Sequence, residues 1–230
     1  MRLTLQLLLA MTLLPSAIAQ AQTPTAAPAG PTHVATYVEV GTGSVKDGIA
    51  LLKQYRDATA KEAGNTRIGV GQELGRANRF VVLEIWKDQA AFDAHGKSAS
   101  TTAFRDKFKT IQNAPYDERL HSGMAVADSP ANAKGAVYVV SHVDVPPPRK
   151  DEVIAALNPL AEQSRKGAGN LRFDVWQQTS RPNHFTVVEA WKDQKAYDAR
   201  GSAAPQRQFR DKLGPMLGAL YDERLYRSVD

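Results

Sequence analysis

The sequence contains no cysteine among its 230 residues. This absence excludes disulfide bridges, iron–sulfur ligation, thiolate metal sites and thiol nucleophiles. Its histidines are scattered without the spacing of metal ligands. It has no glycine-rich phosphate loop, no Gly-x-Ser-x-Gly elbow and no dinucleotide fingerprint. The sequence therefore predicts no metal site and argues against the thiol, serine-hydrolase and nucleotide-dependent enzymes.

Long apolar runs are also scarce. The run from Leu3 to Leu14 is too short for the roughly 20 residues of a membrane span. Met1-Arg2 precedes it and Ala17-Ile18-Ala19 follows it, which is typical of a secretory signal peptide over 1–19 that is cleaved near Ala19. Residues 20–32 are rich in Ala, Pro, Thr and Gln and predict a disordered tether. We therefore expect a periplasmic or secreted protein without a membrane span.

The rest of the chain is a tandem repeat. At an offset of 105 positions, residues 63–122 align with 168–227 without a gap, and about half of the positions are identical. Two copies are too few for a solenoid and indicate duplication of a small domain. The sequence predicts a first domain over 33–122, a linker over 123–136 and a second domain over 137–230.

Each copy shows the pattern β-α-β-β-α-β of a ferredoxin-like fold. In the first copy, strands are expected over 33–40, 66–74 and 79–86, with a helix over 45–62. Asp88 and Asp193 are suited to N-cap short helices that end at Gly96 and Gly201, where the left-handed conformation favours glycine. The predicted fold class is α+β.

Both faces of the predicted strand 79–86 are largely apolar, although the helices of one repeat cover a single face. The sheet of the other repeat is expected to cover the second face. The chain is thus predicted to form an intrachain pseudo-dimer with its sheets packed face to face, and further oligomerisation stays open.

The run from Arg79 to His95 includes Glu84-x-Trp86-Lys87-Asp88-Gln89 and resembles the antibiotic biosynthesis monooxygenase family, which includes quinol monooxygenases. The resemblance covers both copies and implies a dimeric α+β barrel. It also implies a cofactor-independent monooxygenase that oxidises a small aromatic substrate, a quinol or phenol, with O₂. The alternative is a non-catalytic ligand-binding or stress-response module with the same barrel.

His95 is the candidate base, because imidazole titrates near neutral pH, and Trp86 is its candidate catalytic neighbour. The alternative roles are a partly exposed histidine at a helix end and a plain core tryptophan. The second copy has Arg200 in place of His95, and arginine does not act as a base near neutral pH. We therefore expect His-assisted chemistry in the first copy, in a cavity framed by Trp86 and Tyr37. The candidate substrate-binding residues are Tyr37, Phe80, Trp191 and Tyr197.

Glu84 and Glu189 lie on apolar strands and need partners if they are buried. Arg67, Arg119 and their equivalents in the second copy are the expected partners. The β-α-β-β-α-β order also occurs in RNA-recognition modules, but the strand 79–86 lacks their glycine and second aromatic residue, so no nucleic-acid partner is predicted. Residues 101–105 and 206–210 offer no histidine as an axial haem ligand.

Overall fold

The computed structural model of the chain describes residues 30–128 and 135–229. The expected signal peptide, nearly all of the expected tether and residues 129–134 of the expected linker lie outside these ranges. No helix within them is long and apolar enough to cross a membrane.

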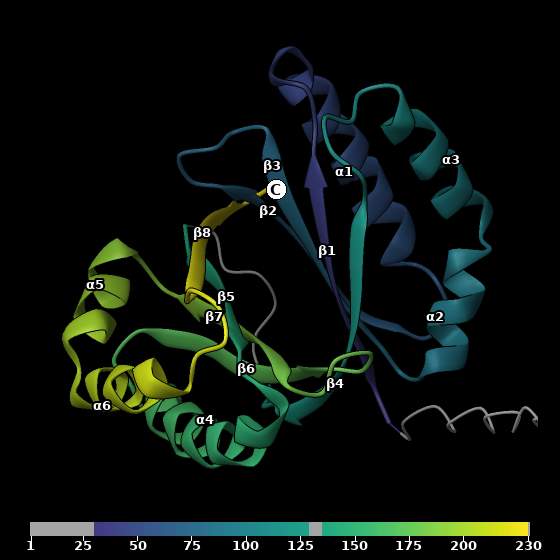
Figure 1. Cartoon of the computed structure of the whole chain (residues 1–230). Coiled ribbons are helices and arrows are strands. Elements are labelled where there is room, and N and C mark those ends of the chain that lie inside the picture. Colours follow the sequence, from purple (N-terminus) through teal and green to yellow (C-terminus); the bar gives the residue numbers. More distant parts are fainter. Residues whose placement is uncertain (1–29, 129–134, 230) are drawn as a thin grey trace, which may run out of the picture.

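The two repeats have the same order of elements (Figure 1). The first consists of β1 (Thr32–Glu39), α1 (Val45–Thr59), β2 (Asn65–Glu73), β3 (Arg79–Trp86), α2 (Gln89–Gly96), α3 (Ala99–Lys109) and β4 (Asp117–Ala125). The second consists of β5 (Val137–Asp144), α4 (Lys150–Arg165), β6 (Asn170–Gln178), β7 (His184–Trp191), α5 (Gln194–Ser202), α6 (Ala204–Leu213) and β8 (Asp222–Ser228).

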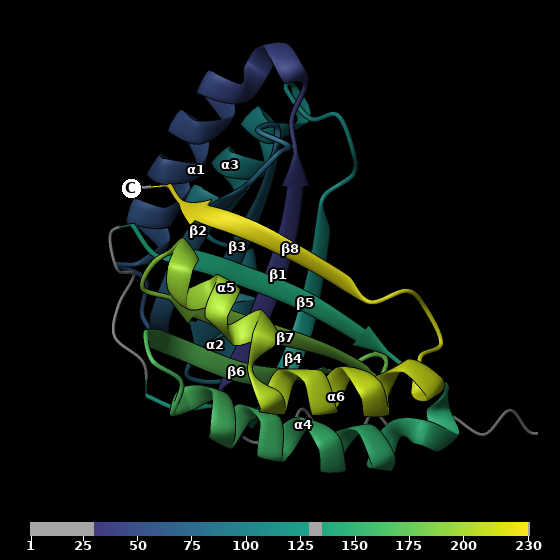
Figure 2. The ribbon, with the colours of Figure 1, turned by 90° about the vertical axis from the view of Figure 1, so that its left-hand side faces the viewer.

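The strands form one closed barrel in the order β1-β3-β2-β8-β5-β7-β6-β4, and β4 pairs again with β1. The last strand of each repeat bridges to the other repeat. β4 pairs with β6, and β8 pairs with β2 (Figure 2). The predicted intrachain α+β barrel is confirmed, and its closure leaves no free sheet edge in the described barrel.

The core has an inner layer and two outer layers. Inside the barrel, Val81 and Leu83 of β3 pack with Val140, Trp176 and other residues of the second repeat. On the outside, α1 and α3 cover the other face of the first-repeat strands, and α4 and α6 cover the second repeat. Figure 1 shows the two helical layers on different sides of the barrel. The expectation that the second sheet covers the helix-free face is confirmed.

The motif Ala-Gly-Asn occurs once in each repeat because it makes a tight contact. Gly64 and Gly169 have φ of +87° and +81°, in the left-handed region. A Cβ on Gly64 would lie 2.6 Å from the Cβ of Ala91, and one on Gly169 would lie 2.7 Å from the Cβ of Ala196. Only glycine therefore lets the start of β2 approach α2, and the start of β6 approach α5, this closely.

Several local expectations can be compared with the structure. Asp88 and Asp193 cap α2 and α5 as predicted, since each carboxylate accepts a hydrogen bond of 2.8 Å from the backbone N–H three residues on. The expectation of left-handed glycines at 96 and 201 is wrong, because neither has a positive φ. Both continue their helices.

Strand and helix ends differ from the predictions by a few residues. α1 ends at Thr59 rather than at residue 62. β4 continues to Ala125 into the expected linker, because these residues pair with β6 of the other repeat.

Candidate functional site

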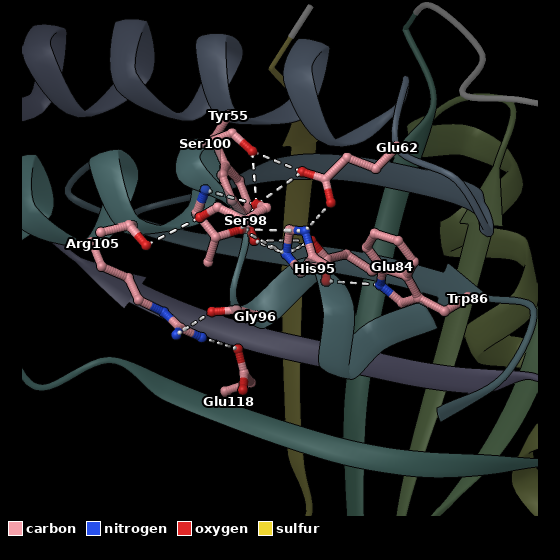
Figure 3. Close-up of polar contacts among 12 residues, drawn as sticks. Tyr55, Glu62, Glu84, Trp86, His95, Gly96, Ser98, Ser100, Arg105 and Glu118 are labelled. Carbon is pink, nitrogen blue, oxygen red and sulfur yellow. Dashed lines mark hydrogen bonds and ion pairs between the residues drawn. The ribbon is translucent and has the colours of Figure 1, made fainter. Parts of the chain in front are cut away.

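The last turn of α2 places His95 in the outer core of the first repeat, where it is 2% exposed. Its Nδ1 lies 2.8 Å from Oε2 of Glu62, and its Nε2 lies 2.8 Å from the hydroxyl of Tyr55. The ring packs on Trp86, with centroids 4.6 Å apart. Figure 3 shows His95 between Glu62 on one side and Glu84 and Trp86 on the other. We call Tyr55, Glu62, Glu84, Trp86 and His95 the first-repeat network.

Glu84 is the buried acid of this network, at 2% exposure. It accepts hydrogen bonds from the Tyr55 hydroxyl at 3.2 Å and from the Trp86 indole N–H at 3.3 Å. Burial raises the pKa of Glu84, and the nearby His95 opposes this shift. The expectation that Arg67 and Arg119 pair with Glu84 is wrong. They are register partners of Ile85 and Ala35, so they face the inside of the barrel whereas Glu84 faces the helices.

In the second repeat Arg200 occupies the position of His95 and is also buried. Its guanidinium binds Glu189 through Nε, at 2.8 Å, and through Nη2. It also contacts Glu223 at 3.1 Å. Burial lowers the pKa of Arg200, but the attraction of Glu189 outweighs this, so the pKa is raised and the group stays cationic. Trp191 completes the cluster by donating its indole N–H to Glu189 at 2.9 Å.

A cavity of about 220 Å³ lies beside this cluster, between the end of α4, β7, α5 and α6. We call it the second-repeat cavity and define it by Gly167, Trp191, Arg200, Ala203 and Gln206. The exposed residues Lys166, Ala168 and Ala199 border its opening.

Gln206 is 2% exposed, and within the described structure neither atom of its side-chain amide has a hydrogen-bond partner. A buried primary amide without partners is unfavourable. Gln206 lines the second-repeat cavity, but its amide atoms are buried, so a ligand contacts them only after a shift of the cavity wall.

The corresponding space in the first repeat is filled by polar side chains. Glu62, Ser98 and Ser100 replace Gly167, Ala203 and Pro205. The hydroxyls of Ser98 and Ser100 donate to Oε1 of Glu62 at 3.2 and 2.7 Å, as Figure 3 shows. Thr101, in place of Gln206, lies 3.2 Å from both His95 ring nitrogens. The two repeats thus differ: these positions carry hydrogen-bonded polar side chains in the first repeat, and their equivalents line a cavity in the second.

The other predicted site residues are divided between the two faces of the sheet. Phe80 packs in the outer core of the first repeat with Val38 and Leu52. Tyr37 lies on the inner face of the barrel. The expected cavity framed by Tyr37 and Trp86 is therefore wrong, because alternate strand residues point to opposite faces.

Trp191 lines the second-repeat cavity. Tyr197 lies next to it and donates its hydroxyl to Glu223 at 2.7 Å. Gln206 and the open space around it were missed by the sequence analysis. The repeat alignment contained the signal, because it pairs small or apolar residues at 167, 203 and 205 with polar ones in the first copy.

A model of the antibiotic biosynthesis monooxygenase family matches the chain twice, over residues 31–107 and 136–212. The chain belongs to this family. Each match lies within one structural repeat and ends before its last strand, and the family resemblance inferred from the sequence is confirmed.

Individual relatives agree with this membership. The Bacillus subtilis protein named "Putative monooxygenase YcnE" is 30% identical over 81 residues, which are 35% of this chain and 85% of that protein. A crystal structure of a "Putative monooxygenase" from Fusobacterium nucleatum has a TM-score of 0.80 at 17% identity and covers 88% of this chain and 94% of that one. An "anthrone oxidase-like protein" of known structure has a TM-score of 0.69 at 13% identity, with 88% and 92% covered. At these identities the structures show a shared fold.

The charged residues that line the second-repeat cavity are Lys166 and Arg200, and the remaining lining is uncharged. The charge of Arg200 is balanced by Glu189 and Glu223. The wall also contains Trp191 and alanine and proline carbons. Within the described residues, no cluster of acids and histidines is arranged to hold a metal ion.

Proposed function

We propose that this protein is a monooxygenase that oxidises a small electron-rich aromatic compound, a hydroquinone or phenol, with O₂ and without a cofactor. The observation that carries the proposal is the second-repeat cavity with the unpartnered amide of Gln206. Family membership supports the reaction class, and the cavity supports the kind of substrate.

The size of the cavity favours a substrate with a single ring. Its volume of about 220 Å³ lies below the range of roughly 300–1,000 Å³ that holds drug-sized ligands. Trp191 contributes an apolar aromatic surface to the wall, although the residue is only 2% exposed. The amide of Gln206 can donate a hydrogen bond to one ring oxygen and accept one from a hydroxyl.

The proposed reaction starts from the phenolate, whose proton is released to solvent, because the anion gives up an electron to O₂ more readily than the neutral phenol. Lys166 at the opening favours this anion, whereas the charge of Arg200 is balanced by Glu189 and Glu223. The reaction balances as hydroquinone plus O₂ giving hydroxybenzoquinone plus water. One oxygen atom enters the ring and the other leaves as water, so no external reductant is required.

The experiment follows O₂ uptake and product mass with a panel of hydroquinones under air. A product heavier than the plain quinone by one oxygen atom identifies monooxygenation, and heat-denatured protein measures spontaneous oxidation. Gln206→Leu should weaken substrate binding by about tenfold, as expected for a hydrogen bond to a charged group. Thr101→Val changes the equivalent residue of the first repeat and should leave turnover unchanged.

His95→Ala is the contrasting variant. If His95 is the base, as the sequence predicts, this substitution lowers turnover by about 10²–10⁴. If His95→Ala has this effect in folded protein and Gln206→Leu has none, the chemistry lies in the first-repeat network and our assignment to the second-repeat cavity is wrong.

A second candidate function is ligand binding without turnover. It is favoured by the lining of the second-repeat cavity, which has neither a histidine nor a carboxylate to act as a base. Binding of hydroquinones by calorimetry, without O₂ uptake above the denatured control, would support this alternative.

We also propose that the protein is exported, on the basis of the signal-peptide pattern at its start. N-terminal sequencing of the protein from the periplasmic fraction should begin at or near Gln20. A membrane-bound chain that retains Met1 to Ala19 would contradict export with cleavage.

A further inference from the structure

A different cavity, of about 200 Å³, lies at one end of the barrel. Inward-facing side chains of β1, β2, β3 and β8 form its wall, and the loop before β4 borders its mouth. We call it the barrel-end cavity and define it by Tyr37, Glu73, Arg79, Arg224 and Tyr226. β2 and β8 belong to different repeats and pair with each other here, so the cavity depends on the closed barrel. It lies on the face of the sheet opposite to the helices, apart from the second-repeat cavity.

Glu73 has a carboxylate oxygen that lacks a hydrogen-bond donor within the described residues. It ends β2 opposite Tyr226, and its side chain is 10% exposed. Within the described residues, Oε2 has no hydrogen-bond donor. The other oxygen, Oε1, makes a long ion pair of 4.0 Å with the Nε of Arg76, whose side chain is 60% exposed. A carboxylate oxygen that is removed from water without a donor is unfavourable.

The other charged groups of the lining are already paired. Arg79 binds Glu39 at 2.8 Å, and Arg224 binds Asp222 at 2.6 Å. Asp117 is held by an arginine two residues along β4 at 2.7 Å. The cavity therefore has one buried carboxylate oxygen without a donor, and this oxygen is complementary to a ligand that carries N–H donors.

Tyr37 supplies a second polar atom. Its hydroxyl is buried and has no partner within the described structure. The guanidinium carbons of Arg119 and Arg224 lie 5.0 and 5.8 Å from the centre of its ring. A further cation is thus better placed at the hydroxyl than over the ring. Ala114 and Pro115 provide apolar contacts for the body of a ligand.

The equivalent positions at the other end of the barrel carry different chemistry. Gln178 replaces Glu73, and histidines replace the two tyrosines, His142 for Tyr37 and His121 for Tyr226. Gln178 donates its amide to Ser180 at 3.1 Å. The carboxylate at this position therefore occurs in the first repeat and not in the second, which itself suggests the control substitution Glu73→Gln.

We propose that the barrel-end cavity binds a small primary ammonium ion with a short apolar body, with its N–H groups directed at Oε2 of Glu73 and the hydroxyl of Tyr37. The cavity volume accommodates one ring or a short alkyl chain. This site is independent of the proposed monooxygenase chemistry.

The test titrates the whole chain with three compounds of similar shape and different charge: benzylamine, benzyl alcohol and benzoate. Calorimetry should give one benzylamine site per chain, with benzyl alcohol and benzoate at least tenfold weaker. Glu73→Gln should lower benzylamine affinity by about tenfold or more, because it removes a charge-assisted hydrogen bond. Tyr37→Phe should lower it several-fold and keeps the proposal testable if Glu73→Gln does not fold.

Asp106→Asn is the control for net charge, since Asp106 is 64% exposed on α3. This variant should bind benzylamine like the original protein. Absence of benzylamine binding, equal binding of benzyl alcohol, or full affinity in folded Glu73→Gln and Tyr37→Phe would each overturn the proposal.

Discussion

Replacing Gln206 by leucine should make the protein more stable and a poorer binder of its aromatic ligand. Gln206 is 2% exposed, and its amide has no hydrogen-bond partner within the described structure. Removing an unsatisfied buried polar group relieves a penalty of about 1–3 kcal/mol. Leucine is apolar and of similar length, so the free energy of unfolding should rise by up to about that amount.

Urea unfolding followed by circular dichroism measures this gain. In a chain of this size each kcal/mol raises the melting temperature by about 2–4 °C. Thr101→Val is the matched control, because Thr101 occupies the equivalent position and its hydroxyl is bonded within the protein, 3.2 Å from His95. This control should lose stability, by about 0.5–1.5 kcal/mol.

The combination of results is diagnostic. A residue that serves a ligand at the expense of the fold gives higher stability and lower affinity when it is replaced. If Gln206→Leu unfolds at lower urea than the original protein, the amide has partners in solution and the reasoning is refuted. If stability rises and hydroquinone affinity is unchanged, Gln206 is free but does not contact the ligand.

Three further predictions concern stability. Arg200→Ala should lower the free energy of unfolding by about 3–5 kcal/mol, because it leaves buried Glu189 unpaired. The double variant Arg200→Ala/Glu189→Gln should recover part of this loss in the same urea assay. A loss below about 1 kcal/mol in Arg200→Ala would contradict the prediction. Ala203→Ser should raise the free energy of unfolding by about 1 kcal/mol by adding an N-cap to α6, as Ser98 caps α3. The converse control, Ser98→Ala, should lower it. An unchanged melting temperature in Ala203→Ser would count against the reasoning. Stability should also fall as the pH drops from about 6.5 towards 4. In that window the unfolded chain takes up protons that the folded barrel excludes, because burial lowers the pKa of three interior histidines, to about 4 for His33, about 3 for His121 and about 4 for His142. Urea midpoints measured against pH should show this slope, His121→Gln should flatten it, and a midpoint independent of pH would exclude the histidines as its source.

The features that could be predicted from the sequence are local or repeated. Strand alternation in Arg79–Trp86 predicted two apolar faces, one for the helices and one for the other sheet, and the structure shows which residues lie on each. The caps at Asp88 and Asp193 depend on contacts three residues apart. The gapless repeat predicted two equivalent domains that cover each other. Each of these inferences needs only the period of an element or the comparison of one copy with the other.

The partners of the buried charges depended on the tertiary structure. Arg67 and Arg119 were plausible partners for Glu84 in sequence, yet they face the interior of the barrel. The actual partners, Tyr55 and His95, come from helices that pack on the opposite face. Which side chains meet across two layers is set by packing between segments far apart in the chain, and strand alternation alone does not report it.

The sequence by itself determined the family, the duplication and the two-faced sheet, because each of these is written in residue order and periodicity. Only the tertiary structure decided that β4 and β8 cross between repeats, since hydrogen bonds between strand edges leave no pattern in the side chains. It also decided which repeat is open. Glu62, Ser98 and Ser100 converge from separate segments to fill one copy, whereas Gly167, Ala203 and Pro205 leave space in the other. A cavity is the volume that several distant side chains fail to fill, so it appears only when those side chains are brought together.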